Sequence, residues 1–209
     1  MTFTLSLKEF SAGAKAGVPV CLGYFSVSFG FGAMAISQGL GVWHAILISA
    51  SSLTSAGQFA GLTVIAAGAA IIEMILTQLV INSRYGLMSL ALGQRFGPDV
   101  GIGGRLAAAF FNTDEVFALG MSRPGKLSTG YFLGAGVIAA AGWIAGTAMG
   151  AIAGTILPES VRVALGVMLY GMFIAIVVPQ AKQETPMLIC LTLAMVFSCL
   201  FAWLPVLQN

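Results

Sequence analysis

The chain has 209 residues, of which 58% are hydrophobic and only 8% are charged, and its mean hydropathy is +0.98. A soluble domain of this size has no core large enough to bury so much apolar surface, so the composition excludes a soluble globular protein and indicates an integral membrane protein. The formal net charge is only +2, and the nine Lys and Arg residues are scattered, which argues against a nucleic-acid-binding surface.

Seven apolar runs follow one another along the chain, at residues 17–39, 43–69, 70–94, 102–121, 127–154, 160–180 and 186–205. Each is near the length of about 20 residues that an α-helix needs to cross about 30 Å of hydrocarbon. We therefore predict an all-α integral membrane protein with about seven transmembrane segments. The first run is longer than the apolar part of a signal peptide, so we expect it to remain as a membrane anchor.

The basic residues between the runs indicate how the chain is oriented. With a cytoplasmic N-terminus, the cytoplasmic side carries Lys8, Lys15, Arg123, Lys126 and Lys182, and the other side carries Arg95, Arg105 and Arg162. Because cytoplasmic loops are enriched in Lys and Arg, this excess predicts that the N-terminus is cytoplasmic.

The second run contains the polar cluster "SSLTSAGQF" at residues 51–59. Ser55 and Gln58 stand in the Ser-x-x-Gln spacing of a capping box, which predicts that a helix begins at this point. The second run would then consist of two half-helices that meet near the middle of the bilayer.

The third run contains the polar cluster "INSRYG" at residues 81–86. Asn82 and Ser83 can each cap a helix N-terminus, and Arg84 lies about halfway along the run. This cluster predicts a second interruption, with a positive charge at mid-depth.

The fourth run contains "FFNTDEVFALG" at residues 110–120. Asn112 or Thr113 can serve as an N-cap, with Asp114 and Glu115 in the first helical turn, where the helix dipole favours negative charge. This cluster predicts a third interruption, with two carboxylates at mid-depth.

A helix start inside the bilayer leaves backbone N–H groups unpaired, at several kcal/mol per group unless protein, water or ligand pairs them. Such interruptions therefore occur where a cavity is lined, and transporters use them to hold substrates near the midplane. At any single cluster the alternative is an unbroken helix whose Ser, Thr and Asn side chains bond back to the preceding turn. Three clusters together favour a cavity, and an inverted-repeat transporter is one architecture compatible with them.

The charges at mid-depth are expected to pair. Each of Asp114, Glu115 and Arg84 costs about 3 kcal/mol at the centre of an inserting helix, so such residues normally face the interior of a bundle. Arg84 can neutralise one carboxylate, and adjacent helical residues point about 100° apart, so the other carboxylate is left to bind a proton or a cation. A purely static ion-pair network is the alternative.

The fifth run has Gly142, Gly146, Gly150 and Gly154 at every fourth position, which predicts close packing against another helix. The partner helix can belong to this chain or to another subunit. Cys21, Cys190 and Cys199 form no cluster with the single histidine, His44, so neither a metal site nor any other cofactor is predicted.

The polar clusters also carry a resemblance to a known family. "TSAGQFAG" is similar to a family pattern of small residues that ends in Gln-Phe, and "NSRYGLMSLAL" is similar to an Asn-x-Arg-His stretch, with Tyr85 where histidine is usual. "NTDEVFAL" resembles Thr-Asp-Glu-x-Phe-Ala-Leu, and "GVMLYGMFIAIVVPQ" follows a looser pattern that ends in Pro179 and Gln180. From about Ala14 to Gln180 the sequence resembles the large subunit of AzlC-type (azaleucine-resistance) branched-chain amino acid exporters.

The resemblance implies export of valine, leucine, isoleucine and in some members methionine across the bacterial inner membrane. It also implies a small hydrophobic companion subunit and a further hydrophobic segment beyond Asn209. On this basis residues 1–209 are expected to form a single transmembrane transport domain, with no enzymatic activity and no nucleic-acid partner.

We interpret the polar clusters as the elements of a permease driven by proton or ion gradients. The residues predicted to bind substrate are Ser55, Ala56, Gly57, Gln58, Asn82, Thr113, Asp114 and Glu115. Arg84, Asp114 and Glu115 are predicted to form an ion pair or to couple protons, and Phe59, Phe111 and Phe117 are candidate apolar walls. A channel with the same residues at a constriction, and a non-transporting scaffold subunit, remain alternative hypotheses.

Overall fold

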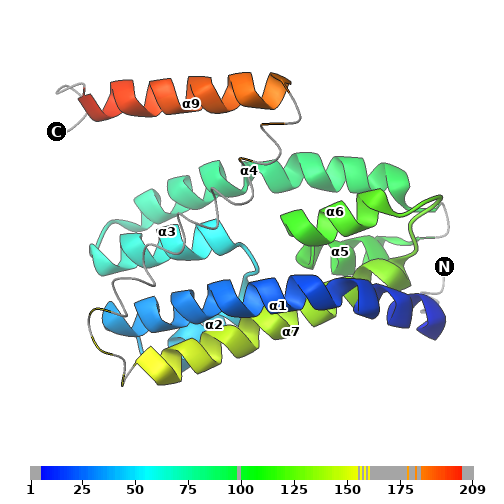
Figure 1. Cartoon of the computed structure of the whole chain (residues 1–209), viewed down its shortest axis with the longest axis horizontal. Helices are drawn as coiled ribbons and strands as arrows, with labels where there is room; N and C mark the ends of the chain where they lie inside the picture. Colours follow the sequence, from blue (N-terminus) through cyan, green and yellow to red (C-terminus); the bar gives the residue numbers. More distant parts are fainter. Residues whose placement is uncertain are drawn as a thin grey trace. The chain divides into compact units, whose positions relative to one another are not determined.

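The computed structural model describes residues 6–97, 100–154 and 185–203, together with positions 156, 158, 160, 178 and 182. The chain forms two compact units, residues 1–166 and residues 167–209. Within the described residues there are eight α-helices and no β-strand, which confirms the all-α prediction (Figure 1).

The first unit contains α1 (Leu7–Ser37), α2 (Val42–Ser51), α3 (Ser55–Ala66), α4 (Ile71–Arg95), α5 (Ile102–Phe110), α6 (Asp114–Ser122) and α7 (Thr129–Gly154). The second unit contains α9 (Thr185–Trp203). Of the predicted runs, 17–39, 127–154 and 186–205 correspond to α1, α7 and α9. The run 160–180 lies almost entirely outside the described residues.

Two of the described helices, α1 and α7, are long and apolar enough to cross a membrane, each with a mean hydropathy of 1.6 over its best window. Helices α2 and α3 and the stretch from Leu188 to Phe201 in α9 are apolar but shorter. The number of seven transmembrane segments and the inverted repeat therefore stay predictions.

Two of the three predicted interruptions are present. The second run is divided between α2 and α3 by an extended segment at residues 52–54, and the fourth run is divided between α5 and α6 at residues 111–113. Both interruptions coincide with the polar clusters that predicted them.

The third predicted interruption is wrong, because α4 continues without a break through "INSRYG". Ser83 donates from Oγ to the backbone oxygen of Val80 at 2.9 Å, and Asn82 donates from Nδ2 to Oε1 of Gln78 at 2.9 Å. Both side chains therefore bond within their own helix, so neither caps a new one.

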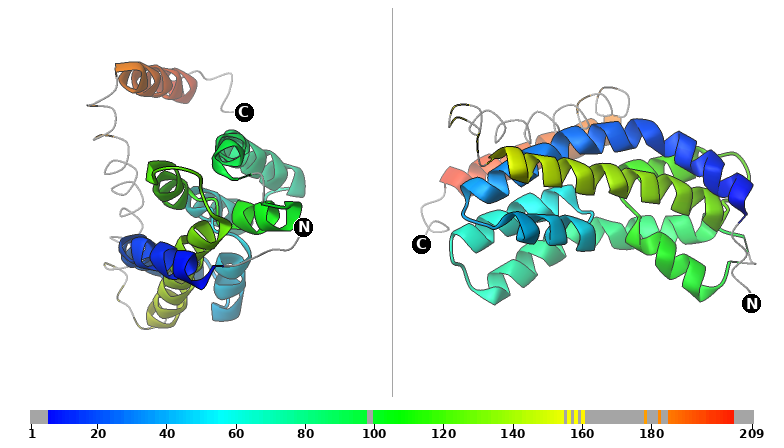
Figure 2. Two further views of the ribbon diagram at one scale, coloured as in Figure 1. Left: turned by 90° about the vertical axis from the view of Figure 1, so that its right-hand side faces the viewer. Right: turned by 90° about the horizontal axis from the view of Figure 1, so that it is seen from below.

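Helices α1 and α7 pack backbone to backbone along Gly142, Gly146, Gly150 and Gly154 of α7 (Figure 2, right). A Cβ atom added to Gly142 would lie 2.4 Å from the backbone oxygen of Cys21, and one added to Gly150 would lie 2.0 Å from that of Phe29. Gly146 and Gly154 approach α1 in the same way. The partner of this glycine face therefore lies within the chain, and any larger residue would force the two helices apart.

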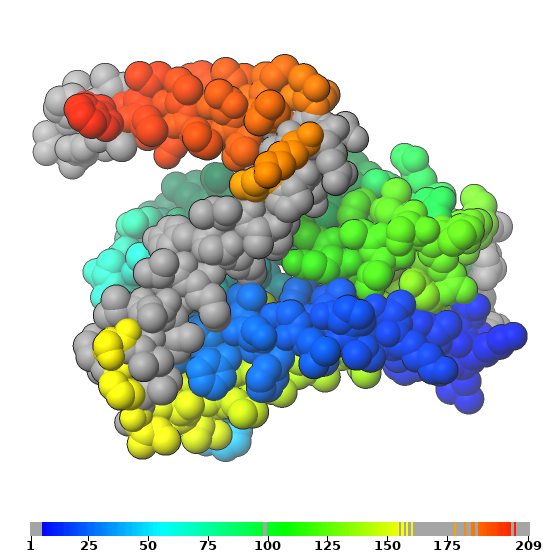
Figure 3. All heavy atoms as spheres, viewed as in Figure 1, coloured from blue at the N-terminus to red at the C-terminus, as the bar shows by residue number. Residues whose placement is uncertain are grey.

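The residue numbers rise together along this contact, from Gly13 against Tyr131 to Ala33 against Gly154, so α1 and α7 run parallel. Helix α6 also reaches α1, and the space-filling view shows their surfaces in contact on one face (Figure 3). These contacts bring the interruptions of α2–α3 and α5–α6 into one region, beside α4 and the middle of α1.

Candidate functional site

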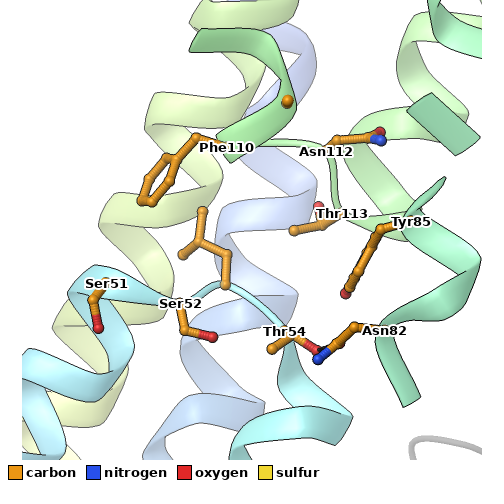
Figure 4. Close-up of a pocket in the computed structure, with 10 residues that line it drawn as sticks. Ser51, Ser52, Thr54, Asn82, Tyr85, Phe110, Asn112 and Thr113 are labelled. Carbon is orange, nitrogen blue, oxygen red and sulfur yellow. Dashed lines mark hydrogen bonds between the residues drawn. The ribbon is translucent and has the colours of Figure 1, made fainter. Parts of the chain in front are cut away.

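A cavity of about 240 Å³ lies where the two interruptions meet α4 (Figure 4). Its walls are formed by the α2–α3 interruption, by one face of α4 and by the α5–α6 interruption. The lining residues are Ser51, Ser52, Leu53, Thr54, Asn82, Tyr85, Ala109, Phe110, Asn112 and Thr113. Most of them are hydroxyl or amide side chains, so the cavity is a polar site inside an otherwise apolar protein.

The interruption between α2 and α3 is stabilised by caps on both helix ends. Thr54, which is the N-cap of α3, accepts a hydrogen bond at Oγ1 from the N–H of Gly57 at 3.3 Å. Gln58 donates from Nε2 to the backbone oxygen of Ile48 at 3.2 Å and to that of Ser52. The backbone oxygen of Ile48 also accepts from the N–H of Ser52 at 3.0 Å, so the Gln58 amide adds a second donor there and supplies the recorded donor of Ser52.

The predicted Ser55–Gln58 capping box is therefore wrong, although the predicted break is correct. The helix begins one residue earlier than a Ser55 cap requires, because Thr54 is the cap and Ser55 is the first helical residue. Gln58 turns back towards the end of α2, where its Nε2 donates to the backbone oxygens of Ile48 and Ser52.

Gln58 also belongs to a buried hydrogen-bond network with α7. It is 4% exposed, and its Oε1 accepts from Nε1 of Trp143 at 2.9 Å and from Oγ of Ser49 at 3.4 Å. Ser49 in turn lies 2.7 Å from Oγ1 of Thr147, oxygen to oxygen. Gln58 thus fixes the interruption to α7 and does not line the cavity.

A second network joins α3 to α4 at the edge of the cavity. Thr54 donates from Oγ1 to Oδ1 of Asn82 at 2.6 Å, and Gln78 donates from Nε2 to the backbone oxygen of Gly57 at 2.8 Å. A Cβ atom at Gly57 would lie 2.7 Å from Oε1 of Gln78, so a larger residue would displace this side chain. Ser55 and Ala56 are half-buried at the start of α3, next to the cavity-lining Thr54.

The interruption between α5 and α6 carries the acidic pair. Thr113 occupies the N-cap position of α6, as predicted, but its side chain makes no capping hydrogen bond. Asn112 donates from Nδ2 to Oγ of Ser89 in α4 at 3.1 Å. Among the described residues, Oδ1 of Asn112 and Oγ1 of Thr113 are buried without a hydrogen-bond partner of acceptable geometry.

The two adjacent carboxylates take different partners. Arg84 contacts Asp114, with 2.5 Å between NH1 and Oδ2, and the two side chains are each 39% exposed. Glu115 accepts a hydrogen bond at Oε2 from the hydroxyl of Tyr24 in α1. The start of α6 is therefore held to α4 by an ion pair and to α1 by a neutral donor, as the 100° between successive helical residues requires.

The structure brings some of the predicted substrate-binding residues to the cavity and leaves others away from it. Asn82 and Thr113 line the cavity, whereas Gly57 and Gln58 are buried at helix contacts. The predicted aromatic walls are also elsewhere: Phe59 stacks edge-on against Phe31, and the aromatic lining residues are Tyr85 and Phe110.

Several lining residues were missed by sequence reasoning. Residues 51–54 immediately precede the predicted helix start, and the run "SSLT" was the available signal for them. Tyr85 stands where the family pattern has histidine, and its side chain lines the cavity. The sequence indicates Asn112 only as a helix cap, although it also lines the cavity.

This fold and this site define a class of protein: an α-helical membrane protein in which two interrupted helices line a polar cavity. The chain belongs to the AzlC family, because the model of that family, described as AzlC protein, matches residues 19–157. The predicted family resemblance is thus confirmed.

The relatives are membrane proteins. The inner membrane protein YgaZ of Escherichia coli K12 is 27% identical over 194 residues, which cover 90% of this chain and 78% of that protein. An uncharacterized membrane protein of Archaeoglobus fulgidus is 28% identical over 178 residues, covering 83% of this chain and 76% of that protein. One of Helicobacter pylori 26695 is 24% identical over 182 residues, covering 86% and 78%. No solved structure matches the chain significantly.

Proposed function

We propose that this chain exports branched-chain amino acids across the bacterial inner membrane, as a proton- or ion-coupled secondary transporter with a small hydrophobic companion subunit. One observation supports transport most directly: two interrupted helices meet at a polar cavity beside an ion pair. Interrupted backbone inside a membrane is tolerated where it lines a cavity, and substrate sites of transporters are built from it. AzlC family membership is consistent with a transport-related role.

The size of the cavity suits the proposed substrates. The cavity volume of about 240 Å³ lies just below the ~300–1,000 Å³ of pockets for drug-sized ligands, as expected for a smaller ligand such as an amino acid. Leu53, Ala109 and Phe110 provide an apolar wall for the side chain, and the hydroxyl and amide groups provide the polar wall. A branched aliphatic zwitterion fits both.

The substrate carboxylate is proposed to lie at the start of α3. The first amides of a helix lack helical partners and carry the positive end of the helix dipole. Thr54 caps the N–H of Gly57, which leaves the amides of Ser55 and Ala56 for the carboxylate. The proposed carboxylate site contains fewer residues than the predicted Ser55–Gln58 segment, because the side chain of Gln58 bonds to α2 and α7.

The coupling ion is proposed to act at Glu115. Asp114 is neutralised by Arg84, whereas the recorded partner of Glu115 is the uncharged hydroxyl of Tyr24. Glu115 is therefore the carboxylate left to take up a proton or to meet a cation. Its release from Tyr24 would free the start of α6 from α1, which joins ion binding to a movement beside the cavity.

The experiment is efflux of labelled leucine from proteoliposomes that contain the full chain with its companion subunit, with and without a pH gradient. Asp114→Ala and Arg84→Ala are expected to abolish export without preventing membrane insertion, because each leaves an unpaired charge beside the cavity. Ser83→Ala is the matched control, since Ser83 neighbours Arg84 but bonds only to its own helix. Full export by both charge variants would refute the mechanism, and unsaturable downhill flux would indicate a channel.

A further inference from the structure

Tyr85 offers a phenol hydroxyl to the cavity from α4. Its side chain is partly exposed and lines the cavity, and Figure 4 shows the ring with its hydroxyl end turned towards Asn82 and Thr54. Asn82 stands three residues before Tyr85 in α4, so the two side chains share one face of that helix. Because Asn82 accepts from Thr54, the N-cap of α3, the Tyr85 hydroxyl lies on the side of the cavity where α3 begins.

The hydroxyl oxygen of Tyr85 has a recorded donor. Arg84 donates from NH2 to that oxygen at 3.5 Å, and its guanidinium lies 5.1 Å from the centre of the ring. A phenol can donate one hydrogen bond as well as accept, and within the described part of the chain no acceptor is recorded for the Tyr85 proton. A hydroxyl that accepts from a charged group is polarised by it and becomes a stronger donor. Tyr85 is therefore a donor that a ligand in the cavity can use.

The group that meets this hydroxyl must be an acceptor. Among the described side chains, the carboxylates of Asp114 and Glu115 already accept from other recorded donors. A ligand carboxylate has about four lone-pair sites, so it can accept from the free amides at the start of α3 and from a side-chain hydroxyl together. Hydrogen bonds to an ionised carboxylate are shorter and stronger than those between neutral groups. The position of Tyr85 beside the start of α3 therefore suits a ligand carboxylate.

We propose that the hydroxyl of Tyr85 donates a hydrogen bond to the carboxylate of the transported amino acid, which makes Tyr85 a specificity-determining residue of the cavity. The inference rests on the proposed function, because it adds a side-chain contact to the carboxylate site at the start of α3. Arg84 contacts both Asp114 and the oxygen of Tyr85, so the ion pair also orients the phenol.

The test measures dissociation constants by ligand-induced thermal stabilisation of the purified full chain. The probes are leucine, 4-methylpentanoate, which lacks the amine, and 3-methylbutylamine, which lacks the carboxylate. Tyr85→Phe keeps the ring and deletes the hydroxyl. It is expected to weaken leucine and 4-methylpentanoate about tenfold or more, because a hydrogen bond to a charged group is lost, and to change 3-methylbutylamine about twofold or less.

Tyr131→Phe is the matched control, because it deletes the same hydroxyl from another tyrosine whose ring lies against an arginine, with Arg123 at 4.0 Å, outside the cavity lining. It is expected to change all three constants about twofold or less. Equal losses for all three probes in Tyr85→Phe would show a structural role and overturn the inference. A loss confined to 3-methylbutylamine would show an ammonium contact and overturn it as well. If leucine alone binds to the wild type, its constant decides, and a loss below about threefold in Tyr85→Phe overturns the inference.

Two results separate this inference from the proposed function. Wild-type protein that binds leucine and 4-methylpentanoate in a Tyr85-dependent way but exports no leucine would retain the contact and refute amino acid export. Export of leucine by the wild type, with unchanged leucine binding in Tyr85→Phe, would retain the proposed function and overturn the inference. Wild-type protein that binds none of the three probes would refute both.

Discussion

At the scale of single residues, Gln58 explains how a helix can be interrupted inside an apolar protein. Its amide donates to two backbone oxygens at the end of α2 and accepts from Trp143 and Ser49. Gln58 is the recorded partner of Nε1 of Trp143, which is buried, and a buried group left unpaired costs about 1–3 kcal/mol. Gln58 therefore fixes the interruption to α7, and Thr54 caps the helix that follows it.

Gln58→Ala is expected to lower the free energy of unfolding by about 2 kcal/mol or more, because Nε1 of Trp143 and the backbone oxygen of Ser52 both lose the partner that Gln58 provides. Thermal unfolding in detergent measures the change. Gln94→Ala deletes the same side chain from an exposed position on α4 and should leave the unfolding temperature nearly unchanged. Equal stability of the two variants would contradict the role assigned to Gln58.

The sequence predicted the position of this break but not the role of Gln58. The Ser-x-x-Gln spacing marks a helix start by local chemistry, and a helix does start there. The carbonyls that Gln58 serves lie six and ten residues earlier, and Trp143 lies 85 residues later. No local pattern contains that pairing.

At the scale of helices, the same residue types interrupt one run and leave another intact. Ser and Thr at residues 51–54 break the second run, whereas Asn82 and Ser83 leave α4 continuous. The difference is tertiary: at the first break, Gln58 and Thr54 pair the exposed helix ends, whereas Ser83 bonds to Val80 in its own helix. Sequence clusters therefore identify candidate breaks, and the neighbouring helices decide which of them form.

The pairing of α1 with α7 depends on glycine at close contacts. Gly150→Ala is expected to destabilise the protein by about 1–3 kcal/mol, because its Cβ would lie 2.0 Å from the backbone oxygen of Phe29 and the helices must separate. Gly23→Ala is the control on α1, since its Cβ meets nothing within 4 Å and alanine favours a helix. Thermal unfolding of both variants tests this, and equal destabilisation would contradict the contact.

At the scale of the first unit, a cluster of polar residues ties one end of four helices together. Arg95 at the end of α4 donates to the backbone oxygens of Met121 and Arg123 at the end of α6. Arg123 contacts Glu9 of α1 at 2.8 Å and lies 4.0 Å from the ring centre of Tyr131 in α7. The parallel course of α1 and α7 places their first turns at the same end, so one arginine can reach both.

The contacts of this polar cluster are not predictable from the sequence, because the count of charges between the apolar runs assigns Arg123 and Arg95 to opposite sides of the membrane. Counting charges between runs treats every loop as solvent-facing and ignores pairing. Here the guanidinium of Arg95 reaches the backbone at Arg123, which places both residues at one end of the unit. The predicted orientation used five basic residues on one side and three on the other, with Arg95 and Arg123 on opposite sides. The structure places Arg95 at the same end as Arg123, so that count has Arg95 on the wrong side. The cytoplasmic N-terminus itself stays a prediction.

The contribution of the Glu9–Arg123 pair can be isolated by exchanging its charges. The side chains are 31% and 25% exposed, so the coupling is expected to be about 1 kcal/mol or less and to fall with added salt. Arg123→Glu alone places two carboxylates together and should lower the unfolding free energy more than Glu9→Gln does. The exchange Glu9→Arg with Arg123→Glu should recover part of the loss, because Ser128 can pair with either residue but the stacking on Tyr131 is gone. A double-mutant cycle at low and high salt measures the coupling free energy. A coupling of zero at low salt would show that the Glu9–Arg123 pair does not stabilise the contact between α1 and the end of α6.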